Sequence, residues 1–327
     1  MMRLPPFTYT APATPEEVVH VLKEEGPGAS IVAGGTDLYP NMKRRQVEPK
    51  TLVSLRRVQG LKGIQKDSDG NVRIGPGATL RDLERNSEFA ATLPALWTAV
   101  ESISTPLLRN MGTIGGNLCL DTRCFYVNQN YEWRRAINHC LKCSGDTCWT
   151  APGSSICWAV NSSDCVPVMM ALDARYRLLG PDGVREVSAA EMYDVTDGRE
   201  WLRRKPGELM TDILIPNQGN ARSVYLKLRR RGTFDFPVLG VAARIEEDGG
   251  VISKANLILN AVGPAPIRCK EAEAALVGQK LSDETIAAAV AVAPKGAKPL
   301  DNTDYMPSWR KKMVSVYTRR ALESLRA

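Results

Sequence analysis

Histidine is scarce in this sequence, which holds only His20 and His139 among 327 residues. So few imidazoles exclude a histidine-rich metal centre and leave little for the usual acid–base catalysis. The Gly-x-Ser-x-Gly and His-Glu-x-x-His motifs of hydrolases and metalloproteases are also missing. We therefore predict that this chain contributes no catalytic residue.

The sequence also lacks a long apolar run. No uninterrupted stretch approaches the roughly 18 residues of a membrane span, and Met1 to Phe7 contain no apolar core of a signal peptide. We therefore expect a cytoplasmic protein without a membrane span. In that reducing compartment, clustered cysteines more often bind metal or do redox work than form disulfides.

A strong imbalance of charge is absent as well. Lysine and arginine number 43 against 36 aspartates and glutamates, a formal net charge of +7, and the two signs are largely interspersed. The densest basic run, Arg229 to Arg231, is short. We therefore expect no nucleic-acid partner, and we interpret the basic excess as a solvated face or a docking surface.

Cysteine, by contrast, is abundant and concentrated. The seven cysteines of one block are Cys119, Cys124, Cys140, Cys143, Cys148, Cys157 and Cys165, and only Cys269 lies elsewhere. One close pair of the zinc type is present, Cys140-x2-Cys143, and the spacings match neither common ferredoxin pattern. Spacing alone leaves zinc and an iron–sulfur cluster level, with unligated cysteines as the weaker alternative.

Two glycine turns are further candidate binding segments. The strand-like residues 29–33 run into Gly34-Gly35-Thr36-Asp37, which precedes a helix-compatible stretch. Paired glycines at such a point let the backbone approach a phosphate closely. The second turn, Thr113-Ile114-Gly115-Gly116-Asn117, adds a hydroxyl and an amide that suit phosphate or ribityl oxygens. A glycine pair of this kind is more often a plain tight turn of the fold, but the two turns together favour a large phosphate-bearing cofactor.

Other segments predict a two-domain α+β chain. Thr14, Pro15 and Glu17 predict a helix start, and Gly180 to Gly183 predict a hairpin turn. The small polar residues 217–221 mark a boundary between domains 1–220 and 221–327. Strands are expected at 51–55, 71–75, 175–179, 184–187, 210–215, 223–229, 238–246 and 255–262, and helices at 80–86, 93–102 and about 305–326.

Taken together, these motifs resemble a known family. The two glycine turns, followed by Asp164-x2-Pro167 and the apolar stretch ending Ala171-Leu172-Asp173-Ala174, are similar to the FAD-binding medium subunit of molybdenum hydroxylases, the xanthine dehydrogenase and CO dehydrogenase family. The resemblance covers nearly the whole chain. It implies an α+β FAD-binding fold of the molybdopterin dehydrogenase (PCMH) type, with a smaller α+β C-terminal domain.

Most members of that family have only about ten residues between the second glycine turn and the Asp-x-x-Pro segment. The cysteine block therefore lies on an insertion, at about residues 119–160. Its pattern resembles the medium subunit of 4-hydroxybenzoyl-CoA reductase, in which Asp-Thr-Arg-Cys is followed by cysteines after 15, 7 and 8 residues. This resemblance implies a [4Fe-4S] cluster with the ligands Cys124, Cys140, Cys148 and Cys157. It leaves Cys119, Cys143 and Cys165 as bystanders, with Cys143 close enough in sequence to replace Cys140 as the alternative.

The family resemblance also implies a set of FAD-binding residues. The segment expected to cradle the diphosphate is Ile31, Val32, Ala33, Gly34, Gly35, Thr36, Asp37 and Leu38. The residues expected near the phosphate, ribityl or ring groups are Ile103, Thr113, Gly116, Asn117, Asp164 and Lys227.

The function implied is electron transfer through FAD and the [4Fe-4S] cluster, between ferredoxin or a similar carrier and a molybdenum subunit. The implied partners are a large molybdenum-cofactor subunit and a small [2Fe-2S] subunit, in a dimer of heterotrimers. One alternative is the FAD subunit of an aldehyde or N-heterocycle hydroxylase. A remote alternative is a zinc-binding interaction module, which metal analysis distinguishes from the flavoprotein.

Overall fold

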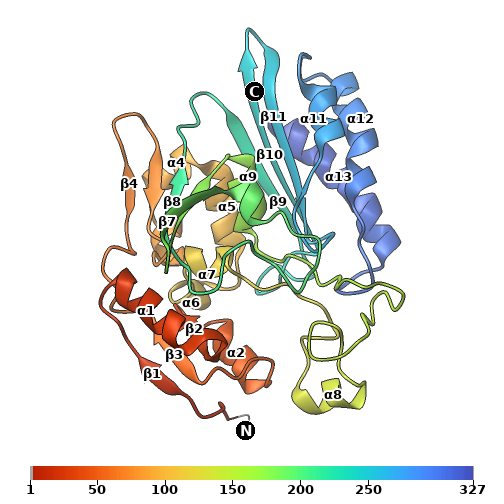
Figure 1. Cartoon of the computed structure of the whole chain (residues 1–327). Coiled ribbons are helices and arrows are strands. Elements are labelled where there is room, and N and C mark those ends of the chain that lie inside the picture. Colours follow the sequence, from red (N-terminus) through yellow and green to blue (C-terminus); the bar gives the residue numbers. More distant parts are fainter. Residues whose placement is uncertain (1–2, 327) are drawn as a thin grey trace.

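The computed structural model describes residues 3–326, which form three β-sheets that follow one another along the chain (Figure 1). A three-stranded sheet lies near the N-terminus, a five-stranded sheet in the middle and a four-stranded sheet near the C-terminus. Helices accompany each sheet, which confirms the predicted mixed α and β class. Within the described residues, no helix has the length and apolarity needed to cross a bilayer.

The N-terminal sheet is parallel, with the strand order β1-β3-β2. Its elements are β1 (Thr8–Thr10), α1 (Pro15–Glu25), η1 (Gly26–Gly28), β2 (Ala29–Val32), α2 (Leu38–Lys43) and β3 (Thr51–Ser54). Helix α1 begins as predicted, because Thr14 accepts a hydrogen bond from the Glu17 backbone N at 3.2 Å and Pro15 takes the first helical position. The sequence did not predict β1, whose three residues carry no hydrophobic alternation.

The middle sheet is antiparallel, with the order β4-β5-β8-β6-β7. Its strands are β4 (Ile64–Lys66), β5 (Val72–Ile74), β6 (Arg175–Gly180), β7 (Gly183–Ser188) and β8 (Leu209–Ile215). The predicted hairpin forms between β6 and β7. Strand β8 lies between β5 and β6, so that segments from before and after the cysteine block share one sheet.

Short helices cover this sheet and line the junction with the next one. They are α3 (Leu80–Glu84), α4 (Ser87–Thr92), α5 (Pro94–Ser102), α6 (Pro106–Arg109), α7 (Ile114–Leu118), α9 (Cys165–Ala171) and α10 (Ala189–Met192). Every residue of α9 is buried, because this helix contacts both α5 and the C-terminal sheet. It therefore belongs to the largest hydrophobic core of the described chain.

The cysteine-rich insertion has little regular structure of its own. Among the described residues 119–160, the one helix is α8 (Tyr131–Ala136). The base of the insertion is closed by two backbone hydrogen bonds of 2.8 Å between Arg123 and Val160. Figure 1 shows the insertion as an irregular lobe at one side of the molecule, below the C-terminal domain and beside α2.

The C-terminal sheet is antiparallel, with the order β12-β11-β10-β9. Its part of the chain holds β9 (Arg222–Leu228), β10 (Leu239–Asp248), β11 (Val251–Asn260), β12 (Ile267–Arg268), α11 (Lys270–Leu276), α12 (Asp283–Val292), η2 (Ala293–Gly296) and α13 (Pro307–Ser324). Helices α11, α12 and α13 cover one face (Figure 1), and α5 and α9 contact the strands from the other side. Helix α13 begins later than predicted, because Tyr305 has a left-handed φ of 67° that a helix does not accept.

A fully buried arginine joins α13 to this sheet. Arg310 donates hydrogen bonds to the backbone O of Val238 at 3.1 Å and of Leu300 at 2.9 Å, and it also reaches Ala261 O. Burial lowers its pKa to about 10, so the guanidinium stays charged at neutral pH. These bonds hold the last helix against the ends of β10 and β11.

We expect Arg310→Met to lower the free energy of unfolding by about 3 kcal/mol, because several buried carbonyls lose their donor. Urea denaturation at pH 7 measures this loss. Lys312→Met is the matched control, since Lys312 is exposed on the same helix. Equal stability of the two variants would show that Arg310 does not anchor α13.

Candidate functional site

The first glycine turn leaves β2 at the carboxyl edge of the parallel sheet. A Cβ on Gly34 would lie 1.9 Å from the backbone O of Met111, and Gly35 has a left-handed φ of 70°. Both positions therefore require glycine. Within the described chain, none of the backbone N–H groups of residues 34–38 donates a hydrogen bond to another residue. This row of free N–H groups is suited to an anionic ligand.

The second glycine turn lies directly against the first. Thr113 caps α7, because its Oγ1 accepts a hydrogen bond from the Gly116 N at 3.0 Å. A Cβ on Gly112 would come within 3.5 Å of Thr36 Oγ1, and one on Gly115 within 2.6 Å of Pro76. The fold thus brings the two predicted turns together, although tight packing by itself already accounts for Gly34 and Gly115.

The strand residues of the predicted diphosphate segment serve the core. Val32 packs with Met42 and Leu52 in a small cluster, and Ile31 contacts the cluster under α1. Their apolar side chains therefore fix the strand that leads into the turn. The polar side chains of Thr36 and Asp37 come directly after the paired glycines.

Asn117 and Asp164 lie side by side, although the insertion separates them in sequence. The Asn117 Oδ1 accepts a hydrogen bond from Ser163 Oγ at 2.7 Å and another from the Cys165 N at 3.3 Å. This amide closes the gap between α7 and α9. The fold thereby brings together two residues that the family resemblance assigns to one cofactor.

Asp164 forms a buried ion pair with Lys227 of β9. The Lys227 Nζ lies 2.8 Å from Asp164 Oδ2 and 3.0 Å from Ser102 O, and the two side chains are 5% and 3% exposed. The Tyr225 hydroxyl donates to Asp164 Oδ1 at 2.7 Å. Burial, together with the charge of Asp164, raises the pKa of Tyr225 well above its usual value. The network joins the end of α5, the start of α9 and the C-terminal sheet.

Ile103 follows α5, and its position is set by a second ion pair, between Arg109 and Glu84. The Arg109 Nη1 donates to Ile103 O at 2.8 Å, while Nε and Nη2 bind the two carboxylate oxygens of Glu84 at 3.0 and 2.9 Å. This bidentate contact with Arg109 is the main cause that lowers the pKa of Glu84 to about 2. The pair thus holds the backbone of a predicted flavin contact.

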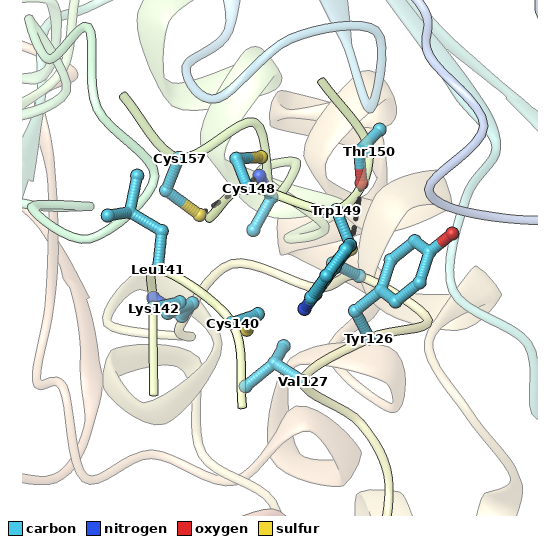
Figure 2. A pocket seen from close by; sticks show the side chains of 11 residues that line it. Tyr126, Val127, Cys140, Leu141, Lys142, Cys148, Trp149, Thr150 and Cys157 are labelled. Carbon is cyan, nitrogen blue, oxygen red and sulfur yellow. Dashed lines mark hydrogen bonds between the residues drawn. The ribbon is translucent and has the colours of Figure 1, made fainter. Parts of the chain in front are cut away.

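Four cysteines of the insertion line one pocket, and they are the four that the resemblance selected: Cys124, Cys140, Cys148 and Cys157. Figure 2 shows Cys140, Cys148 and Cys157 around this pocket, with the Trp149 ring across it and Tyr126 beside it. All four thiols are buried. Burial raises the pKa of Cys124 and of Cys140, and it raises that of Cys157 to about 12.

The remaining cysteines of the block do not line this pocket. Cys143 lies beside it, where its Sγ contacts the Nη1 of the buried Arg134. Cys165 is buried within α9, and burial raises the pKa of both Cys119 and Cys165. That these three cysteines are bystanders stays a prediction.

The four pocket thiols are not arranged around a single ion. Among the described residues, no three side chains of histidine, cysteine, aspartate or glutamate come close enough to hold one metal ion. A tetrahedral zinc site needs sulfur atoms only about 4 Å apart, because each Zn–S bond is about 2.3 Å. The arrangement therefore does not resemble a preformed zinc centre.

Side-chain contacts to backbone oxygens attach the insertion to all three parts of the fold. The Arg134 Nη2 donates to Arg44 O and Arg45 O at 3.0 and 2.7 Å, which reaches the end of α2. Lys142 Nζ donates to Gly198 O at 2.7 Å, and Asn302 Nδ2 to Trp158 O at 2.7 Å. The pocket is thereby held in a fixed place relative to the glycine turns.

Local sequence patterns do not mark Ser102, Arg109, Arg123, Arg134 or Tyr225 as site residues. Each acts through a partner far away in the chain, as Tyr225 does with Asp164. No local spacing signals such a contact, apart from the Asp-Thr-Arg-Cys motif in which Arg123 precedes a cysteine.

Comparison with known families and structures finds matches over most of the chain. Residues 5–218 match the FAD binding domain in molybdopterin dehydrogenase, and residues 223–325 match the CO dehydrogenase flavoprotein C-terminal domain. The solved CO dehydrogenase of Hydrogenophaga pseudoflava contains a chain that superposes with a TM-score of 0.80 and 28% identity, covering 98% of each chain.

Two relatives of the same kind are similar in sequence. The carbon monoxide dehydrogenase medium chain of Afipia carboxidovorans is 31% identical over 98% of this chain and 97% of its own length. The aldehyde oxidoreductase FAD-binding subunit PaoB of Escherichia coli is 30% identical over 83% of this chain and 86% of its own.

The Glu84–Arg109 pair predicts a defined pH dependence of stability. Because the folded-state pKa of about 2 lies below the ordinary value of 4.5, the carboxylate stabilises the fold above pH 4.5. This contribution, about 3 kcal/mol, is lost as the pH falls from 4.5 toward 2. Urea denaturation of wild type and Glu84→Gln across that range should show their difference shrinking. The exposed Glu88→Gln is the control, and a constant difference would contradict the assignment.

Proposed function

The chain belongs to the family of FAD-binding subunits of molybdenum hydroxylases, and on that premise we propose that it is a flavin and [4Fe-4S] electron-transfer subunit, similar to that of 4-hydroxybenzoyl-CoA reductase. Membership makes the chain a subunit of an oxidoreductase complex with an FAD-binding domain. The proposal adds the cluster, the electron carrier and the kind of complex.

The observation that carries the proposal is the pocket lined by four buried cysteines. Their spacings of 15, 7 and 8 intervening residues repeat the pattern that the resemblance associates with a [4Fe-4S] cluster. The relatives described above are named for FAD or as medium chains and not for iron. The cluster therefore rests on the cysteines of this chain alone.

The donor set has the composition that a [4Fe-4S] cluster requires. A [4Fe-4S] cluster takes one thiolate for each iron, so its four ligands are spread around a body larger than one ion. The thiols Cys124, Cys140 and Cys157, whose pKa values are raised, would release their protons on coordination.

The residues of this chain bind and orient the cofactors. FAD exchanges two electrons and an iron–sulfur cluster one, so a protein holding both can pass electrons singly. The free N–H groups of residues 34–38 would hold the FAD diphosphate. Lys227 would place a positive charge at the other side of the site, kept in position by Asp164 and Ser102 O. Trp149 and Tyr126 would screen the cysteine pocket from water.

The proposed partners are a large molybdenum-cofactor subunit and a small [2Fe-2S] subunit, in a dimer of heterotrimers. The carbon monoxide dehydrogenase relatives are named as medium chains, which supports a place in a complex of several subunits. The substrate would react on the molybdenum subunit. We propose ferredoxin or a similar one-electron carrier as the external partner, because a cluster offers such a carrier a direct route.

A second candidate is the FAD subunit of an aldehyde or N-heterocycle hydroxylase. It is favoured by the aldehyde oxidoreductase relative and by the nicotinate dehydrogenase FAD-subunit of Eubacterium barkeri, which is 26% identical over 88% of this chain. Both candidates contain FAD. They differ in the substrate of the complex, which in either case would react on another subunit. Turnover of 4-hydroxybenzoyl-CoA, aldehydes and N-heterocycles by the purified complex distinguishes them.

Cofactor analysis tests the proposal directly. We expect the purified chain to contain FAD and about four iron atoms with matching sulfide, as a [4Fe-4S] cluster requires. Zinc in place of iron, with FAD present, would refute the cluster and leave the family assignment intact. Zinc without FAD would instead favour the interaction module.

Two cysteine variants test the choice of ligands. We expect Cys148→Ser to lose the iron, because one of four thiolates is missing, while FAD remains bound. Cys143→Ser is the matched control and should keep its iron, since Cys143 does not line the pocket. Iron content and electron paramagnetic resonance of the reduced protein measure both. Loss of iron in Cys143→Ser with retention in Cys148→Ser would overturn the assignment.

The electron carrier is tested by anaerobic reduction of the complex. We expect reduced ferredoxin to bleach the flavin absorbance of the wild type rapidly and that of Cys148→Ser slowly, because the variant lacks the one-electron route. NADH serves as the comparison donor. Rapid reduction of both proteins by NADH would show that electrons enter at the flavin instead.

A further inference from the structure

Arg123 is a buried arginine at the base of the cysteine insertion, next to the proposed ligand Cys124. Its backbone N and O both pair with Val160 at 2.8 Å, so its position is fixed by the same contact that closes the insertion. Its side chain is 9% exposed. The guanidinium lies 4.8 Å from the centroid of the Phe236 ring, on the connection between β9 and β10.

The guanidinium points from the insertion to the first glycine turn. Its Nη2 forms an ion pair with Asp37 Oδ1, and Asp37 Oδ2 accepts a hydrogen bond from Asn41 Nδ2 at 3.0 Å. The ion pair neutralises the carboxylate that follows Gly34 and Gly35. A turn with a neutralised carboxylate tolerates an anion much better than one with a free negative charge.

The ion pair does not use up the donors of Arg123. Within the described residues, Nε is buried and has no acceptor, whereas Nη2 is taken by the ion pair with Asp37. Buried N–H groups without acceptors are rare and costly, so the Nε of Arg123 requires an explanation. It lies beside a turn whose N–H groups at residues 34–38 are also without acceptors. All these donors together would be satisfied by one anionic ligand.

We propose that Arg123 binds the diphosphate of FAD, so that the cysteine insertion supplies part of the flavin site. FAD carries its negative charge on the diphosphate, and a planar guanidinium suits phosphate oxygens because it presents parallel N–H donors. The inference rests on FAD binding, which family membership establishes, and not on the cluster. It makes one short segment, Arg123 and Cys124, a contact to both cofactors.

Arg123→Met tests this role, because methionine keeps most of the side-chain volume without the charge or the donors. We expect the deflavinated full-length variant to bind FAD roughly 10- to 100-fold more weakly than wild type, measured by quenching of flavin fluorescence. Iron content should be unchanged. Arg135→Met is the control, since Arg135 is exposed on the same insertion, and its FAD affinity should equal that of wild type.

A double-variant cycle separates direct binding from neutralisation of Asp37. If Arg123 binds the diphosphate, Arg123→Met/Asp37→Asn should bind FAD more weakly than Asp37→Asn alone. If Arg123 only neutralises Asp37, the two should bind FAD equally, which would overturn the inference. Arg123→Lys should restore part of the affinity, because it returns the charge without the fork.

The outcomes also separate this inference from the proposed function. Unchanged FAD affinity in Arg123→Met would refute the role of Arg123 while leaving the flavoprotein assignment and the cluster untouched. Joint loss of FAD and iron in Arg123→Met would assign the arginine to folding of the insertion and would equally overturn the inference. A wild-type chain with FAD but no iron would refute the cluster and leave Arg123 to be tested as before.

Discussion

The buried ion pair between Asp164 and Lys227 is the contact on which the arrangement of the site depends. Both side chains are almost fully buried, and the pair is satisfied further by Tyr225 and by Ser102 O. Loss of either charge would leave the other buried without compensation, at a cost of about 3–5 kcal/mol. Because Asp164 precedes α9 and Lys227 lies on β9, the pair requires the two halves of the chain to meet in one register.

The insertion depends on that frame because its own core is one small cluster of buried thiols and apolar side chains. It contains one short helix. The side chains of Arg134 and Lys142 bind backbone oxygens of the N-terminal and middle parts of the chain. Asn302 of the C-terminal part binds the backbone O of Trp158 in the insertion. Its interior is instead lined by four thiols and by aromatic rings. Small irregular segments of this kind commonly use a metal centre in place of a hydrophobic core.

The two proposed cofactor sites are connected through neighbouring residues. Cys124 belongs to the thiol pocket, while Arg123 reaches Asp37 at the first glycine turn. A cluster and a flavin held by adjacent residues would keep a fixed separation, because neither residue can move without breaking the backbone bonds to Val160. Such rigidity suits electron transfer, in which the protein supplies position and the cofactors supply the chemistry.

The sequence by itself determined the features that depend on neighbouring residues. These are the Thr14–Pro15 helix start, the β6–β7 hairpin and the glycine positions. Only the tertiary structure decided that β8 lies between β5 and β6, and that Arg123 meets Asp37. Such contacts join residues far apart in the chain, and burial and charge select them only after the chain has folded.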